Sequence, residues 1–501
     1  MEMESKDLEL ARREDYLIKA TIRCDDQSIA DVPCKVFLPE RFGTAPYLIL
    51  KPERDAFEKI VHARQCSLDA RFPATIGPPE LAQWMTIAAP EVWVTSAQTQ
   101  YWGEDLTERT IQCEPQDLHV VRAFPPSGAC DGTQISFIVS QNVILDPGIS
   151  PIMSYTGTVE QMRSVTVRFD LDESGSVTMD REFQHRRLKN GDMLQWSELI
   201  ASLKTSVPAS DSEQIKATLL PTLDDFLLVA SMVARQRFVC LGWRAHDNAG
   251  MATSYRGNYT FPAATAGTGF HSWMVDPAHV HEFIQSCYTR FRSQADKMAL
   301  RIALHALVPC GELMLESSFL RLFAGLEALV LAHRRGEGLE FVMAEDEWKR
   351  LRPCIEQSIK AWNSPGLTKR QRDLIYKKLP ELNRVPLKDA LTGFFEMHSV
   401  FVDDLWPIFR TKDLVGLADI RNRLIHGDSF PSGLIHSLGI AKLHLERVLE
   451  RAVVRLLGGN IGVTKIGPAH RGEEWVQRDY FAREAARLGA IVNNEESPGG
   501  N

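Results

Sequence analysis

The 501-residue chain lacks the features that mark secreted, disulfide-stabilised or membrane-spanning proteins. Its nine cysteines are odd in number, widely spaced and include no Cys-x-x-Cys pair, which argues against a disulfide scaffold and a zinc ribbon. The first residues show no basic segment followed by an apolar one, so no signal peptide is expected. Apolar runs such as 226–234 fall far short of the roughly 20 residues that cross a bilayer. We therefore expect a cytoplasmic protein with reduced, mostly packed thiols and no membrane partner.

The chain also lacks an excess of basic charge and the common catalytic loops. Its formal net charge of −8 excludes a general nucleic-acid coat, so any nucleic-acid contact needs a local basic patch. We find no phosphate-cradling glycine loop, nucleophile elbow or zinc-protease motif, and we expect no cofactor or metal. The apolar fraction of 44% and charged fraction of 24% are typical of a globular protein. The length predicts two or three domains.

The N-terminal half is predicted to be rich in β-strands. Alternating or β-branched runs occur at 91–95, 134–140 and 164–169, and a turn at 172–175 suits a hairpin. One buried helix is expected at 226–233, with Thr222 as its cap. We expect residues 1–265 to form a β-rich region, either a sandwich or an antiparallel sheet, with a linker at 263–270.

The pattern changes to helices after about residue 275. Asp276 before Pro277 is typical of a helix start, and apolar residues recur at helical spacing in 280–291 and 315–330. Further helices are predicted at 343–361, 368–379, 387–404, 411–425 and 433–457. Short breaks between them predict an up-and-down bundle over 275–458. Residues 459–501 are expected to hold one more helix and a disordered tail. The fold class is thus α+β and multidomain.

One short motif carries chemical information: Arg421, Asn422 and His426, followed by Gly427. On a helix, Asn422 and His426 share a face, whereas Arg421 and His426 lie about 140° apart around the axis. Gly427 permits a left-handed exit, which places His426 in the last turn, at the negative end of the helix dipole.

These residue types suit phosphodiester cleavage without a metal. A histidine can exchange protons near pH 7, and an arginine can hold a phosphate and neutralise charge in a transition state. An asparagine can orient either group. RNA supplies its own nucleophile, the 2′-hydroxyl, so RNA is the expected substrate. The alternative is that His426 only caps its helix and Arg421 is an ordinary surface charge.

Two further features bear on this motif. Residues 351–390 contain nine basic and four acidic side chains, a local balance of +5, which predicts either an RNA contact or a solvated helical face. Glu327 lies between apolar neighbours on a predicted helix. It is expected either to hold Arg421 in place or, as the blander alternative, to pair with Arg321 or another nearby arginine.

The motif and its helical context resemble the HEPN superfamily of ribonucleases. Residues 319–329 and the ending 420–427 resemble the ApeA-like branch, and the resemblance covers roughly residues 280 to 457. It implies metal-independent RNA cleavage by a homodimer or higher oligomer whose two motif helices form one composite site. It further implies His426 as the acid/base, Arg421 as the phosphate stabiliser and Asn422 as the positioning residue. Service in antiviral defence or abortive infection is implied too, with a phage-derived or nucleotide trigger at the otherwise unassigned N-terminal region.

Two other functions stay open from the sequence. The helical region is alternatively a non-catalytic HEPN module that binds RNA, a nucleotide or a partner protein. In a third interpretation the N-terminal half is the active part, a carbohydrate- or protein-binding sandwich, and the helices serve for dimerisation. The polar run 243–247 and the pair His279 and His281 are weaker signals, and a strand end and surface histidines explain them.

Overall fold

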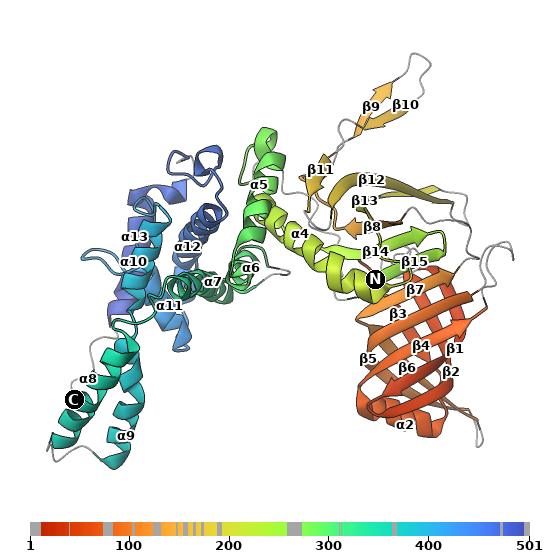
Figure 1. Ribbon diagram of the computed structural model, residues 1–501, viewed down its shortest axis with the longest axis horizontal. Helices are drawn as coiled ribbons and strands as arrows, with labels where there is room; N and C mark the ends of the chain where they lie inside the picture. Colours follow the sequence, from red (N-terminus) through yellow and green to blue (C-terminus); the bar gives the residue numbers. More distant parts are fainter. Residues whose placement is uncertain are drawn as a thin grey trace. The chain divides into compact units, whose positions relative to one another are not determined.

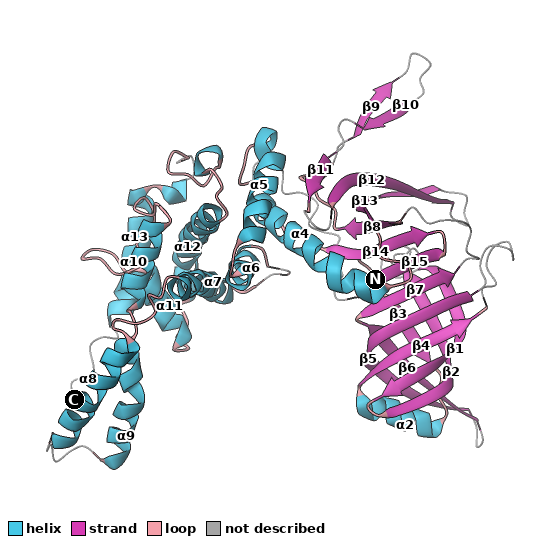
Figure 2. Cartoon of the chain, viewed as in Figure 1, coloured by secondary structure: helices cyan, strands magenta, loops and turns pink. Residues whose placement is uncertain are grey.

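The computed structural model describes residues 12–39, 41–73, 84–102, 106–123, 132–146, 149–153, 159–163, 167–171, 175–187, 193–257, 273–309, 311, 313–362, 368–470 and 474–494. The chain divides into two compact units: unit 1 is Met1–Ala230 with Phe238–Ser272, and unit 2 is Ser231–Arg237 with Trp273–Asn501. Strands dominate unit 1 and helices dominate unit 2 (Figure 2). The predicted α+β class is confirmed. The predicted linker at 263–270, the turn residues 172–174 and the tail 495–501 lie outside the described residues.

Unit 1 is built on one large antiparallel sheet. Its strands are β1 (Arg12–Cys24), β2 (Gln27–Pro39), β3 (Tyr47–Leu50), β4 (Gln65–Phe72), β5 (Trp84–Trp102), β6 (Leu106–Pro115), β7 (Asp117–Ala123), β8 (Thr133–Val139), β11 (Val167–Asp170), β12 (Ser176–Arg187), β13 (Met193–Thr205), β14 (Cys240–Asp247) and β15 (Gly250–Arg256). Their order is β11-β12-β13-β8-β14-β15-β7-β5-β4-β1-β2-β3-β6. A separate hairpin joins β9 (Ile149–Met153) and β10 (Val159–Arg163). Of the two alternatives, the structure therefore shows the antiparallel sheet.

The first six strands close into a ring because β5 pairs with both β4 and β6 (Figure 1). Buried and exposed residues alternate along β1, where Ile18, Ala20 and Ile22 face a common core and Lys19 and Arg23 face solvent. This period of two is what a sheet with one buried face requires. Helix α2 (Arg54–Ala63) adds its buried Ile60 to the same core. The ring therefore surrounds a hydrophobic core of unit 1.

The predicted helix at 226–233 is present as the C-terminal part of α4 (Leu220–Ala234). Its predicted start is wrong, because the helical stretch begins at α3 (Ser212–Gln214) and continues through a π-helical turn at Ile215–Leu219. Asp211 is the cap, accepting the backbone N–H of Gln214, while the Thr222 hydroxyl donates to the Thr218 carbonyl. Among the described residues, Ser212–Ala234 is one helical stretch long and apolar enough to span a membrane. However, 67% of its most apolar window is buried, as in a core helix.

Unit 2 contains nine helices in its described part. They are α5 (Val280–Ser293), α6 (Lys297–Leu307), α7 (Leu315–Gly336), α8 (Glu345–Ala361), α9 (Lys369–Lys378), α10 (Leu387–Met397), α11 (Leu417–Ile425), α12 (Ile435–Leu456) and α13 (Arg478–Asn494). Helix α7 packs against α6, α10, α11 and α12, and α12 packs in addition against α6 and α13. Residues buried on nearly every side of α12 mark it as the central helix. As predicted, Asp276 caps the start of the unit by accepting the N–H of Ala278.

Three details of the helix prediction are wrong. Helix α6, capped by Asp296, was not expected as a separate element. The helix predicted at 387–404 ends at Met397, and the one predicted at 411–425 begins only at Leu417. The intervening segment 398–416 is a structured loop, which we call the anchor loop. Pro407 lacks the N–H that a helix needs, and Gly416 sits where no side chain fits, so the segment cannot continue either helix.

The described cysteines and the polar run 243–247 are part of the packing and hydrogen bonding of the fold. Among the described cysteines, six are buried and Cys354 is exposed, and none forms a disulfide. Burial raises the pKa of the Cys34 thiol to about 12. In the run 243–247, Trp243 is buried, and Arg244 pairs with the Glu198 carboxylate at 2.7 Å. Asp247 accepts N–H groups of the β14–β15 turn.

Candidate functional site

The motif lies on α11, and the start of that helix is fixed by space. A Cβ atom at Gly416 would lie 2.5 Å from the backbone nitrogen of Arg410, so only glycine fits this position. The Asp419 carboxylate accepts the N–H of Gly416 at 3.0 Å and the Nε–H of Arg410 at 3.1 Å. A carboxylate in the first turn also suits the positive end of the helix dipole. Helix α11 therefore begins at a defined residue and holds the motif in a fixed register.

Arg421 is the motif residue that the structure constrains most. Its Nη2 donates to both carboxylate oxygens of Glu327 on α7, at 2.9 and 3.2 Å. Its Nη1 donates to the Asn422 side-chain oxygen at 3.0 Å, and its guanidinium lies 5.7 Å from the centre of the Phe323 ring. Two helices thus hold one arginine through a carboxylate, an amide and an aromatic ring.

The blander expectation for Glu327 is wrong. Arg321 donates to the carbonyl of His305, and Glu327 holds Arg421 instead. The Arg421 and Glu327 side chains are 27% and 30% exposed, so the pair is only partly withdrawn from solvent. The spacing of Phe323 and Glu327, four residues apart on one helix, is the signal that places both beside the same guanidinium.

His426 stands at the exit of the helix, as predicted. Its backbone N–H donates to the Asn422 carbonyl at 3.1 Å, and Gly427 follows with a left-handed φ of +88°. The side chains of Asn422 and His426 are exposed. Within the described part of the chain, the His426 ring makes no hydrogen bond, whereas Arg421 and Asn422 are joined. A single chain therefore brings two of the three motif residues together and leaves the histidine exposed to solvent.

The anchor loop that precedes α11 is held by buried hydrogen bonds. The Trp406 indole N–H donates to the Val415 carbonyl at 2.8 Å, and the Trp406 backbone N–H donates to Nδ1 of His444 at 3.2 Å. The other ring nitrogen of His444 faces the Trp475 carbonyl at 2.9 Å. Because Nδ1 accepts, His444 is neutral with its proton on Nε2. Burial lowers the pKa of His444 to about 4.

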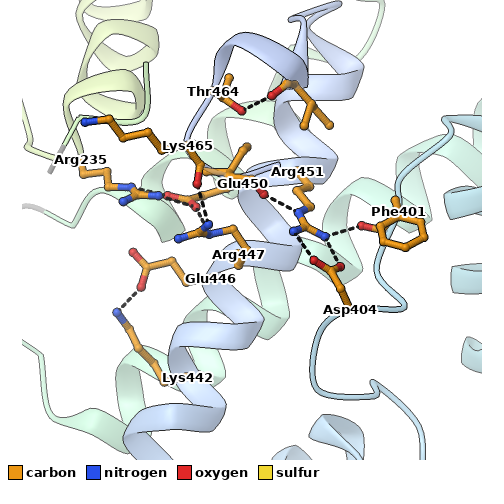
Figure 3. A network of polar contacts seen from close by, with 12 residues as sticks. Arg235, Phe401, Asp404, Lys442, Glu446, Arg447, Glu450, Arg451, Thr464 and Lys465 are labelled. Atoms are coloured by element: carbon orange, nitrogen blue, oxygen red, sulfur yellow. Dashed lines mark hydrogen bonds and ion pairs between the residues drawn. The ribbon is translucent and has the colours of Figure 1, made fainter. Parts of the chain in front are cut away.

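A buried ion pair fixes the same loop to α12 (Figure 3). The Arg451 guanidinium donates to both Asp404 carboxylate oxygens, at 2.6 and 2.9 Å, and the two side chains are 1% and 6% exposed. Arg451 also donates to the carbonyls of Phe401 and Ile466. All three nitrogens of this guanidinium thus donate to protein acceptors, as a buried charge requires.

Glu450, the residue before Arg451 on α12, is the centre of a second set of contacts (Figure 3). Its carboxylate accepts Nε–H and Nη2–H of Arg235 at 2.7 and 2.9 Å and lies 3.2 Å from Nε of Arg447. Arg447 donates further to the Lys465 carbonyl. Within unit 2, α12 therefore ties together the segment 231–237, the anchor loop and the segment around 465.

The anchor loop also borders a cavity of about 710 Å³. Leu391, Phe395, Trp406 and Phe481 form apolar parts of its lining, and exposed cations such as Lys412 lie at its edge. In the described residues no three histidine, cysteine or acidic side chains gather as a metal site would require. His279 and His281 are both exposed.

Comparisons with protein-family models, characterised proteins and solved structures find no match to this chain. The assignment to the HEPN superfamily therefore stays a prediction from the motif and its helical context.

Loss of the Arg451 charge is expected to destabilise unit 2. In Arg451→Met the Asp404 carboxylate stays buried without its partner, which costs about 3–5 kcal/mol. Arg455→Met, an exposed arginine one turn later on α12, is the matched control and is expected to change the stability by less than about 0.5 kcal/mol. Denaturant unfolding followed by helical circular dichroism measures both, and equal losses would contradict the role of the buried pair.

His444 is expected to make the fold sensitive to acid. Its folded-state pKa of about 4 lies below the ordinary value of 6.5, so between these values the unfolded chain binds more protons. The contribution of His444 to the free energy of unfolding is fully present above pH 6.5. It is lost as the pH drops toward 4, by about 3 kcal/mol in total. In His444→Gln this part of the pH dependence is expected to vanish. An identical pH profile of unfolding free energy in both proteins would show that His444 is not responsible.

Proposed function

We propose that the chain is a cytoplasmic, metal-independent endoribonuclease of the HEPN type that acts in antiviral defence. The observation that carries the proposal is the arrangement on α11: Arg421 held by Glu327 and Asn422, with an exposed His426 at the end of the same helix. An immobilised cation and a solvent-exposed proton carrier are the two groups that phosphodiester cleavage needs.

Arg421 keeps donors for a phosphate while it is paired. A guanidinium has five N–H groups. Among the described residues, Glu327 takes those of Nη2 and Asn422 takes one of Nη1, which leaves the Nε–H and one Nη1–H for a ligand. Glu327 thus fixes the orientation of Arg421 without using up its capacity, and it avoids the entropy loss of ordering a long side chain when RNA binds.

The proposed reaction is transesterification within the RNA. The 2′-oxygen forms a bond to the adjacent phosphorus, and the bond from phosphorus to the 5′-oxygen of the next nucleotide breaks. A base takes the 2′-hydroxyl proton, an acid gives a proton to the leaving 5′-oxygen, and no electrons are transferred. His426 serves as this acid/base, Arg421 stabilises the charge on the phosphoryl oxygens, and Asn422 positions Arg421. The products are a 2′,3′-cyclic phosphate and a 5′-hydroxyl.

A second copy of the chain is proposed to complete the site. Arg421 and His426 are five residues apart on one helix, so they point about 140° away from each other. Ile425, next to His426, is 51% exposed, so the end of α11 offers an apolar side chain that a partner can cover. In a homodimer, Arg421 of one protomer and His426 of the other can act on one phosphate.

The strand-rich unit 1 is the proposed sensor. It forms a compact unit with its own closed sheet and core, so a phage-derived molecule or a nucleotide that binds there can act on unit 2 as a separate body.

The test is to express wild type and His426→Ala at matched levels, with and without phage challenge, and to follow total RNA and tRNA integrity. We expect cleavage by triggered wild type and a loss of about 10²–10⁴-fold in His426→Ala, the usual contribution of an acid/base group. His470→Ala, at an exposed histidine outside the motif, is the control and is expected to behave as wild type.

Three results separate the alternatives. Cleavage that is unaffected by a metal chelator supports the proposed chemistry, whereas loss of cleavage with chelator contradicts it. If wild type and His426→Ala cut RNA equally, His426 is not the acid/base. If neither cuts under any challenge while both bind RNA, the helical unit is the non-catalytic binding module.

A further inference from the structure

Helices α8 and α9 form a hairpin that has no share in the core of unit 2. Neither helix has a buried residue, and they pack against each other (Figure 1). Three of their apolar side chains, Leu351, Leu374 and Ile375, are between 37% and 54% exposed. Helices of a compact domain normally owe their stability to one buried face, so a hairpin without one needs another explanation.

The hairpin gathers cations that have no anionic partner. In the described part of the chain, six basic residues between 360 and 378 make no ion pair: Lys360, Lys369, Arg370, Arg372, Lys377 and Lys378. The first half of α8 differs, because Lys349 pairs with Glu345 and Arg352 pairs with Glu356. Positive charge is therefore concentrated on α9 and the end of α8, where it outweighs the single acid of α9, Asp373, and favours the binding of an anion.

A groove between the two helices collects part of this charge. It has a volume of about 620 Å³, and its lining includes Lys360 from α8 and Lys369 and Arg372 from α9. Tyr376 lines it too, with its hydroxyl 3.5 Å from the Glu356 carbonyl. Glu356 is already engaged by Arg352, so Asp373 is the one carboxylate in the lining without an ion pair. The groove thus carries a net positive charge that comes from both helices.

An exposed aromatic ring stands beside the groove. Trp362 follows the last turn of α8, two residues after Lys360, and is 63% exposed. A tryptophan this exposed on a charged surface has no packing role. Cations that follow a backbone, together with an aromatic ring on which a base can stack, are the combination that binds single-stranded nucleic acid.

We propose that the α8–α9 groove binds the phosphate backbone of single-stranded RNA, with Trp362 stacking on a base. The groove is a substrate-binding site outside the motif, which we call the RNA grip: it binds the RNA, while the residues on α11 cleave it. This inference rests on the proposed function for the identity of the RNA, but it predicts binding at residues far along the chain from the motif.

The test measures RNA affinity in a full-length chain that does not cut. A labelled single-stranded RNA is titrated with His426→Ala, and with His426→Ala that also carries Lys360→Ala, Lys369→Ala and Arg372→Ala. Removing three phosphate contacts is expected to weaken binding at least tenfold. It is also expected to reduce the magnitude of the negative slope of log affinity against log salt by about two. His426→Ala with Trp362→Ala is expected to lose about fivefold or more.

A matched control removes the same charge elsewhere. Lys19→Ala, Arg23→Ala and Lys59→Ala, placed on His426→Ala, take away three exposed cations of unit 1 and are expected to leave affinity and salt slope unchanged. Circular dichroism of each variant verifies that it is folded. A titration with DNA of the same sequence tests whether the groove prefers RNA. Weaker binding of DNA supports RNA as the occupant, whereas equal binding of DNA and RNA contradicts it.

The inference and the proposed function fail in different ways. If the groove variant binds RNA as tightly as its parent, or if the parent binds no RNA, the groove is not an RNA grip, whatever wild type cuts. If the groove variant loses affinity while wild type never cuts RNA, the grip stands and the nuclease proposal falls.

Discussion

The buried pair of Arg451 and Asp404 is the interaction on which the rest of the helical unit depends. It holds the anchor loop against α12, and that loop leads directly into α11. Ion pairs of this kind add little net stability, since desolvation offsets their attraction, but breaking one is costly. The pair instead selects one position of the anchor loop on α12, because Arg451 donates to Asp404 and to the carbonyls of Phe401 and Ile466 at the same time.

Hydrogen bonds connect the anchor loop to the motif on α11. Trp406 bonds to Val415 inside the anchor loop, Asp419 receives the N–H of Gly416, and α11 begins at Leu417. Helix α7 then reaches the motif from the other side, where Glu327 holds Arg421. The outcome is an asymmetric pair of groups: an arginine held by Glu327 and Asn422, and an exposed histidine at the end of the same helix.

Sequence patterns predicted what local physics determines. The alternation in β1, the Asp276 cap and the left-handed exit at Gly427 follow from rules that act within a few residues. The patterns failed where distant contacts decide. The predicted helices ran to residue 404 and began again at 411, yet residues 398–416 form a loop whose Asp404 and Trp406 bond to Arg451 and His444, far along the chain. The Glu327–Arg421 pair was one of two open alternatives, because a sequence does not say which arginine a carboxylate will meet.

The closure of β1 to β6 into a ring could not be predicted from the sequence either. It depends on β5 pairing with β4 along Met85–Trp93 and with β6 along Val92–Trp102, and such pairings leave no signal in the periodicity of any single strand. Separate strands were predictable, but the order that joins them was not.

The proposed function is cleavage of RNA through the 2′-hydroxyl by the groups on α11. Analysis of the fragment ends tests it most directly, using an RNA in which one nucleotide at a mapped cleavage position carries a 2′-deoxy sugar. We expect 2′,3′-cyclic phosphate and 5′-hydroxyl ends on the all-ribose RNA and no cleavage after the deoxy nucleotide. Fragments with 5′-phosphate ends, or cleavage after the deoxy position at the same rate, would contradict it.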